Sequence, residues 1–147
     1  MKHLENAALK GRPNKKAPEG VAITFTNRDE ELEIDAKESP LTVAHLLRNG
    51  RWWHSRASEI KGRSEEQARI ANKGLDEIEA TEDKGYIRLE DQRYNLLLSW
   101  AKDYLLAMYE THMPYVVDQL DVLAAEGDKV LAAEKPATES KSKKAKK

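Results

Sequence analysis

The segment from about residue 90 to residue 111 carries the most strongly apolar helical pattern in the chain, and this pattern limits what the rest can fold into. Apolar residues recur there at steps of three and four, which is the spacing of one helical face. Glu90 and Asp91 at its start suit the positive end of a helix dipole. We therefore expect this helix at the centre of the core. Its face comprises Tyr94, Leu97, Leu98, Ala101, Tyr104, Leu105 and Met108, widened by Leu96 and Trp100.

An antiparallel hairpin is expected ahead of the helices. The run VAITFTN at 21–27 alternates apolar and polar residues, and ELEIDA at 31–36 places Leu32 and Ile34 on one face. The polar run NRDE lies between them, as in a hairpin turn. A two-stranded hairpin is marginally stable alone, so its apolar face must pack on the helices that follow. A second, brief extended piece is expected at Tyr86–Leu89.

Capping and turn residues predict three further helical stretches. Ser39 and Pro40 form an N-cap followed by proline at the first helical position, and Gly50 suits the end of that helix. Ser64, with Gln67 three residues later, forms a capping box that begins a new helix. A last helix is expected from Pro114 to near residue 127, with a short extension beyond it. Each of these helices has an apolar face that could join the core.

These patterns predict one α+β domain, with an N-terminal antiparallel β-hairpin packed on a bundle of four to five helices and flexible basic ends. A chain of 147 residues has room for one domain with a core. The predicted parts are a flexible basic arm at 1–20, the domain at 21–135 and a disordered Lys-rich tail at 136–147. Glycines and prolines among lysines and asparagines favour a flexible arm at the N-terminal end, and a proline followed by a lysine-rich run favours a disordered tail.

The net charge of −1 hides a strong asymmetry along the chain. Residues 1–20 carry about +3 and the last ten residues +4, whereas residues 21–40 and 101–137 each carry −4. The ends are therefore basic and the body is acidic. Either the ends contact something anionic or they serve as solubilising tails.

The composition and motifs argue against most catalytic chemistry. The chain has no cysteine, which excludes disulfides, thiolate zinc sites and cysteine nucleophiles. The four histidines, at positions 3, 45, 54 and 112, form no H-x-x-x-H pair and no H-E-x-x-H motif. Glycine-rich phosphate loops and a G-x-S-x-G motif are also absent. We expect a protein that is not an enzyme and has no metal or cofactor.

No stretch approaches the roughly 18 consecutive apolar residues of a membrane span. The first 16 residues lack the apolar region of a secretion signal. We therefore expect no membrane partner and a cytoplasmic location.

The stretch NGRWWHSRA at 49–57 places two tryptophans and a histidine between arginines. Consecutive helical residues point about 100° apart, so Trp52 and Trp53 cannot both face one core. Trp53 belongs to a series that continues to Ala57 and Ile60, which predicts Trp53 in the core and Trp52 at its boundary. Tryptophan there could fill a gap at a helix corner. Alternatively, the stretch is a cationic and aromatic patch that binds a protein or stacks on nucleobases.

Several pieces of the chain resemble small accessory proteins of tailed bacteriophages and prophages. They are a charged hairpin leading to PLTVAHLL, a basic stretch with RIANKG, and GYIRLEDQRYNLLLSWAKDY with a closing PYVVDQLDVL, spanning roughly residues 21–125. The resemblance implies a binding protein of the phage or host cytoplasm, or a minor virion component, and it assigns no functional residues. The RWWHSR stretch and the basic tail depart from it.

The function expected first is a non-enzymatic protein–protein interaction module, as in a phage-encoded accessory or minor virion assembly protein. It would bury an apolar and aromatic surface on a protein partner or on a second copy of itself. The residues predicted to form this surface are Arg51, Trp52, Arg56 and Tyr109.

Two alternatives remain open at this point. One is an acidic DNA mimic, with the acids around residues 29–38 blocking a host enzyme. The other is a nucleic-acid-binding accessory protein that uses both basic ends and the RWWHSR patch. Its predicted phosphate contacts are Lys10, Arg12, Lys15, Lys16, Lys141, Lys143, Lys144, Lys146 and Lys147.

Overall fold

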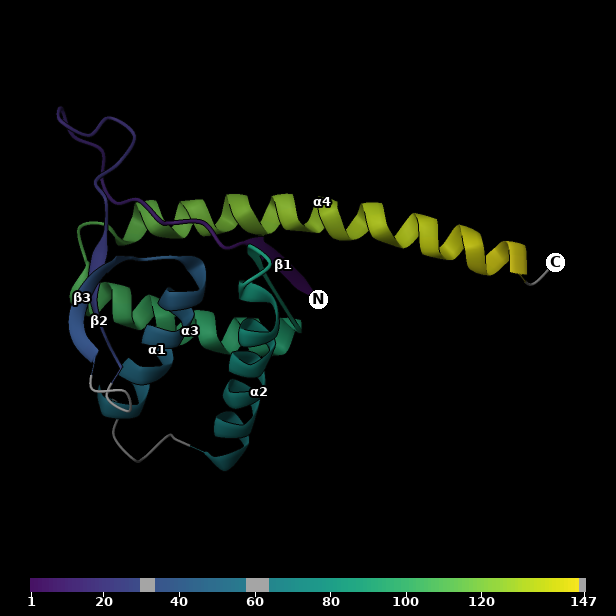
Figure 1. Ribbon diagram of the computed structural model, residues 1–147, viewed down its shortest axis with the longest axis horizontal. Helices are drawn as coiled ribbons and strands as arrows, with labels where there is room; N and C mark the ends of the chain where they lie inside the picture. Colours follow the sequence, from purple (N-terminus) through teal and green to yellow (C-terminus); the bar gives the residue numbers. More distant parts are fainter. Residues whose placement is uncertain (30–33, 58–63, 146–147) are drawn as a thin grey trace.

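The computed structural model describes residues 1–29, 34–57 and 64–145. It is an α+β fold with a set of four helices, as the sequence predicts. Figure 1 shows α4 lying along one side of the body and continuing well past it. In chain order the elements are β1 (Lys2–Glu5), β2 (Thr24–Asp29), β3 (Ile34–Pro40), α1 (Val43–Ala57), α2 (Glu65–Glu82), β4 (Tyr86–Leu89), α3 (Asp91–Met108) and α4 (Met113–Ala145).

Helix α3 lies at the centre of the core, as predicted from its apolar face. Leu97, Ala101 and Leu105 on this face are fully buried. Met108, the last residue of the predicted face, is exposed instead. The chain leaves helical geometry at Tyr109, so α3 ends about three residues earlier than the sequence suggests.

Helix α1 does not end at Gly50, contrary to the prediction. Gly50 lies inside the helix, where its backbone touches α3 directly. A Cβ at this position would lie 2.6 Å from both the amide nitrogen and the Cα of Ala101. Only glycine allows two helix backbones to come this close. The helix therefore passes through both tryptophans and ends at Ala57.

The start of α1 also differs from the prediction. Pro40 is the last residue of β3 rather than the first residue of a helix. The hydroxyl of Thr42 accepts a hydrogen bond of 3.3 Å from the amide of His45, which is an N-capping arrangement. This cap begins α1 at Val43, three residues later than the Ser39–Pro40 pair predicts.

The first eleven residues are not a flexible arm, contrary to the prediction. Strand β1 pairs antiparallel with β4, with Lys2 opposite Leu89. Leu4 and Leu9 are fully buried in the core. These two leucines stand five residues apart, a spacing that matches neither a helix nor a strand, so no periodic pattern marks them in the sequence. The brief extended piece predicted at β4 is confirmed.

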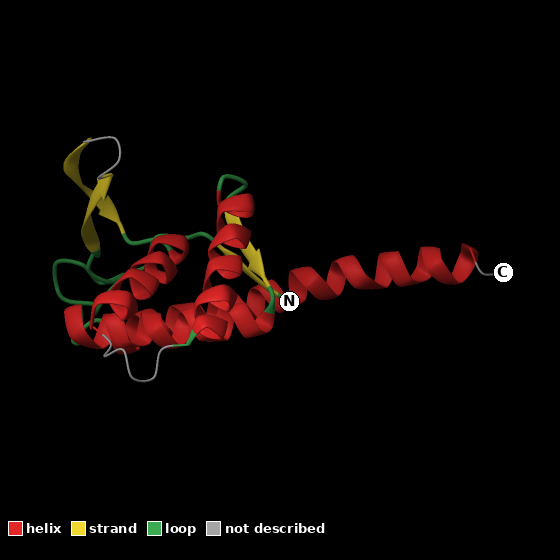
Figure 2. Cartoon of the chain, turned by 90° about the horizontal axis from the view of Figure 1, so that it is seen from below, coloured by secondary structure: helices red, strands yellow, loops and turns green. Residues whose placement is uncertain are grey.

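Helix α4 is much longer than predicted, because two residues expected to limit it do not. A Cβ on Gly127 would collide with the backbone carbonyl of His3, so this glycine allows β1 to lie against α4. The helix then continues past Pro136 to Ala145, where a disordered tail was expected. Figures 1 and 2 show its C-terminal part leaving the body beyond β1.

The predicted hairpin is confirmed, although its second strand lies further along the chain. Strand β2 pairs antiparallel with β3, with Thr24 opposite Pro40 and an irregularity between Asn27 and Asp29. Phe25 at its base packs edge-on against the ring of His45, with 4.9 Å between centroids. The rest of the hairpin stands away from the helices (Figure 2).

The predicted capping box at the start of α2 is confirmed in its first half. The hydroxyl of Ser64 accepts a hydrogen bond of 3.0 Å from the amide of Gln67. The other end of α2 is tied to α1, because the guanidinium of Arg48 makes two hydrogen bonds with the carboxylate of Glu82. The first contact fixes where α2 begins, and the second holds the end of α2 against α1.

We expect Gly50→Ala to destabilise the fold. The added methyl group must push α1 away from α3, and such overpacking costs about 1–3 kcal/mol. The gain in helix propensity, about 1 kcal/mol, does not offset this cost. Urea unfolding should show a lower midpoint for this variant. Asn72→Ala at an exposed site of α2 is the control and should leave the midpoint unchanged or slightly raised. An unchanged Gly50→Ala midpoint would contradict the close contact.

We also expect stability to depend on the protonation of His45. Burial, and then the nearby charge of Arg48, lower the pKa of this imidazole from its ordinary value of 6.5. As the pH is lowered, the unfolded chain therefore binds a proton at His45 before the folded chain does. The contribution of the neutral imidazole to the free energy of unfolding is complete above pH 6.5 and is lost as the pH falls below it.

The measurement is urea unfolding at about pH 7.5 and about pH 5.5, for the native chain and for His45→Asn. Asn keeps a polar group near the Thr42 hydroxyl but does not titrate. The loss of unfolding free energy on acidification should be smaller in the variant. An equal loss in both proteins would show that His45 plays no part.

Candidate interaction surfaces

The C-terminal half of α1 carries three of the four residues predicted to bind a partner. Trp52 is 52% exposed, and the guanidinium of Arg56 lies 4.9 Å from the centre of its ring. Such a cation–π contact keeps the cation and the ring together at the surface. We call the surface formed by Arg51, Trp52 and Arg56 the α1 face.

Trp53 points in a different direction from Trp52, as the helical spacing predicts. Its ring is half-buried, packs against the core and lies 6.4 Å from the ring of Tyr104. The side-chain amide nitrogen of Asn49, Nδ2, donates a long hydrogen bond of 3.4 Å to the Tyr104 hydroxyl. Burial, and then a hydrogen bond with Tyr109, raise the pKa of the Tyr104 phenol above its ordinary value. The ring therefore stays neutral and belongs to the packing beneath the α1 face.

Trp100 of α3 lies beneath the α1 face and is almost fully buried. The ring of His54 stacks on it at 3.9 Å with only 8° between the planes. The guanidinium of Arg51 lies 5.3 Å from the same indole. Arg51 is therefore partly occupied in covering Trp100, whereas Trp52 faces solvent. A hollow of about 190 Å³ opens beside them, lined by Arg51, His54, Ser55, Ser64, Gln67, Ala68 and Trp100.

Tyr109, the fourth predicted partner residue, does not belong to this surface. It is half-buried, and its ring meets that of Tyr104 edge-on at 5.7 Å. Its hydroxyl donates a hydrogen bond of 3.2 Å to the backbone carbonyl of Thr24 at the base of the hairpin. The prediction of an exposed Tyr109 is therefore wrong, because the residue follows the end of α3 and no longer obeys the spacing of its faces.

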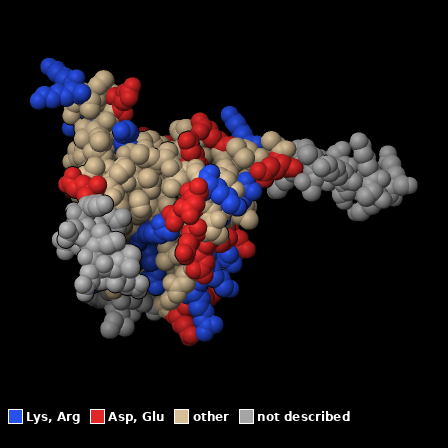
Figure 3. All heavy atoms as spheres, in the orientation of Figure 1, with Lys and Arg blue, Asp and Glu red and all other residues tan. Residues whose placement is uncertain are grey.

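The basic residues predicted to contact phosphates fall into two separate groups. Arg12, Lys15 and Lys16 are exposed on a loop beside the start of α4, where the amide of Arg12 donates to Nδ1 of His112. Figure 3 shows Lys and Arg side chains at the tip of this loop. Lys10 is tied down by hydrogen bonds between its backbone and the side chain of Gln119.

The second basic group lies at the other end of α4. Residues 141–144 belong to its last turns, while Lys146 and Lys147 lie outside the described residues. A helix of 33 residues is about 50 Å long, so this length separates the two groups. The fold therefore does not bring the two basic groups together.

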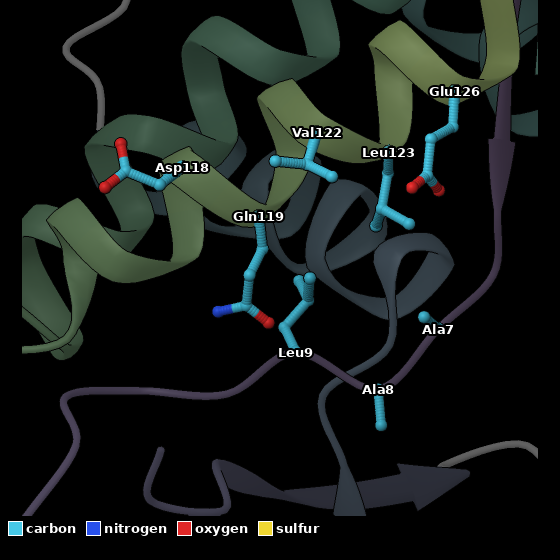
Figure 4. A pocket seen from close by; sticks show the side chains of 8 residues that line it. All are labelled: Ala7, Ala8, Leu9, Asp118, Gln119, Val122, Leu123 and Glu126. Atoms are coloured by element: carbon cyan, nitrogen blue, oxygen red, sulfur yellow. The ribbon is translucent and has the colours of Figure 1, made fainter. Parts of the chain in front are cut away.

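A second surface, absent from the predictions, lies between α4 and the N-terminal segment. It is a hollow of about 380 Å³, which we call the α4 groove. Figure 4 shows Gln119 and Leu123 pointing from α4 toward Leu9, with carboxylates at both ends of the row. The groove is lined by Ala7, Ala8, Leu9, Asp118, Gln119, Val122, Leu123 and Glu126.

The sequence contains a signal for this surface. Val116 and Leu120 of α4 are fully buried on its inner face, as expected for one apolar stripe. Val122 lies off that stripe and is 57% exposed. Apolar residues on two sides of one helix indicate that both sides are covered. The groove itself could not be predicted, since its other wall comes from residues assigned to a flexible arm.

Comparison with known proteins gives no match, since no family model, no curated protein and no solved structure is similar to this chain. In the described part of the chain, none of the helices combines the length and apolar character of a membrane span. Among the same residues, no group of three histidine or acidic side chains is placed to hold a metal ion.

The three tryptophans should differ in their access to solvent. Trp52 is exposed, whereas Trp100 is shielded by His54 and Arg51. We expect Trp52→Phe to remove one component of the tryptophan fluorescence. This component has the longest emission wavelength and is quenched most strongly by acrylamide. Trp100→Phe, as the matched variant, should leave that component in place. The reverse pattern would contradict the orientation of α1.

Proposed function

We propose that this chain is a non-enzymatic protein–protein interaction module that binds an acidic protein surface through the α1 face. The observation that carries the proposal is the exposure of Trp52 on a helix whose opposite side is fixed in the core. A tryptophan buried at an interface contributes a large apolar area, and tryptophan and arginine dominate binding energies at such sites. The neighbouring arginines favour a partner that offers carboxylates.

The rigidity of α1 supports this proposal. Gly50 holds its backbone against Ala101, and the His54–Trp100 stack secures the helix a turn later. A side chain presented from a fixed helix loses little freedom on binding, which leaves more of the contact energy as affinity. The resemblance to phage accessory proteins fits such a role, in assembly or in contact with a host protein.

Nucleic-acid binding is the second candidate, and the distribution of charge makes it the weaker one. Its two basic groups lie at opposite ends of α4, and the helix between them carries Asp118, Asp121 and Glu126. A phosphate backbone reaching both groups would pass those carboxylates, which repel it. The DNA-mimic alternative depends on the acidic hairpin, and residues 30–33 of it lie outside the described part of the chain.

The test compares Trp52→Ala with Leu106→Ala in capture experiments with the full chain as bait in a bacterial lysate. Both side chains are large and more than half exposed, but only Trp52 belongs to the α1 face. Removing a central interface tryptophan costs about 2 kcal/mol or more, which is about 30-fold in affinity. We expect Trp52→Ala to lose a protein that the native chain and Leu106→Ala retain, at unchanged melting temperature.

Four results would overturn the proposal. Trp52→Ala could retain every captured protein, or both variants could lose the same one. Capture that disappears after nuclease treatment would favour nucleic acid instead. A lowered melting temperature for Trp52→Ala would show that the side chain serves packing.

A further inference from the structure

Helix α4 is divided into an acidic and a basic part. Residues 113–134 contain five acids and one lysine, whereas residues 135–145 contain four lysines and one acid. The first part lies along the body, and the second leaves it beyond β1 (Figures 1 and 2). Figure 3 shows acidic side chains where α4 leaves the body. One helix therefore presents opposite charges at separate places.

Only some of the acids in the first part form salt bridges with other described residues of the chain. Asp128 pairs with Lys2 at 3.9 Å, and Glu134 pairs with Arg88 at 2.9 Å. Asp118 and Glu126 form no salt bridge with any residue that the structure describes, and both line the α4 groove. The groove thus combines an apolar floor with two carboxylates that remain available to cations.

The part of α4 beyond residue 134 is a helix without an evident support inside the chain. The two ribbon views show no described element alongside it (Figures 1 and 2). Isolated helical segments shorter than about 12–15 residues are marginal in water. Pro136 destabilises this part of the helix further, because proline inside a helix removes a backbone hydrogen bond. A helix here needs a surface to pack on.

We propose that two copies of the chain pair antiparallel through α4, with the basic part of each helix lying in the α4 groove of the other. An antiparallel pair centred on Leu131 places residues 136–144 of one copy opposite residues 118–126 of the other. Lys144 of one chain then lies opposite Asp118 of its partner, and Lys141 lies opposite Asp121. Val122 and the exposed Ala8 become buried under the incoming helix.

A second copy fits this groove because the chain carries both halves of the contact. In a two-fold symmetric pair the same contact forms twice, so each basic part finds an acidic groove at once. The chain cannot satisfy itself, since α4 is one continuous helix and its two parts cannot meet. This pairing is independent of the α1 face, which belongs to other elements.

The test is a charge exchange in the full chain, read as molecular mass by light scattering over a concentration series. The tail variant combines Lys141→Glu, Lys143→Glu and Lys144→Glu. The groove variant combines Asp118→Lys and Asp121→Lys, the two acids that this register places opposite those lysines. Each variant alone sets like charges against each other and should be monomeric, whereas the native chain is a dimer. An equal mixture of the two variants should regain the dimer mass, because both contacts are then attractive. Raising the salt concentration should weaken the native dimer and the mixed dimer, because salt screens the attraction between their opposite charges.

A matched pair of apolar positions provides a second measurement. Val122→Lys removes an apolar contact and repels the incoming basic helix, so it should raise the dimer dissociation constant more than tenfold. Leu106→Lys on α3 should not change it. A native chain that stays monomeric at all concentrations would overturn the proposal. So would a dimer that survives both charge variants, or a mixture of them that remains monomeric. Circular dichroism of each variant checks that it is folded.

Discussion

The backbone contact between α1 and α3 at Gly50 and Ala101 determines where most other parts of the molecule can lie. Helices that approach this closely bring the side chains on either side of the contact face to face. The stack of His54 on Trp100 and the approach of Trp53 to Tyr104 are the two results. Because Trp53 turns inward, the helical step of about 100° turns Trp52 outward. The exposure of Trp52 is thus a geometric consequence of Gly50, two residues earlier in the chain.

The N-terminal segment completes the fold by joining parts that are distant in sequence. Strand β1 lies between β4 and α4, and Gly127 allows its backbone to reach the helix. The guanidinium of Arg88 donates to Nδ1 of His3 at 3.1 Å and pairs with Glu134 at 2.9 Å, so it ties both strands to α4. The same segment forms one wall of the α4 groove. The groove therefore exists only because these residues are ordered.

The sequence predicts those features that depend on local spacing, and fails where a distant contact decides. The face of α3, the Ser64 cap and the opposite orientations of the two tryptophans all follow from neighbours within a few residues. Gly50 and Gly127 were assigned to helix ends, because glycine for a terminus and glycine for close packing look the same locally. Strand β1 has four residues and a partner some 85 positions away, which no short pattern reveals. Because the N-terminal segment is not predicted to be ordered, the wall that it gives to the α4 groove cannot be predicted either.

The charge division of α4 has a simpler explanation that must be weighed against pairing. A helix favours acids near its N-terminus and bases near its C-terminus, through its dipole. That effect fades within the first and last turns, and the first turn of α4 contains no acid. The dipole can therefore account for lysines close to Ala145, but not for Asp118 and Glu126, which lie further along the helix and line a groove. Both carboxylates are exposed at the two ends of an apolar row, where a cation that approaches the groove meets them. A basic helix from a second copy supplies the counter-charge, and by packing there it covers the exposed Val122 and Ala8.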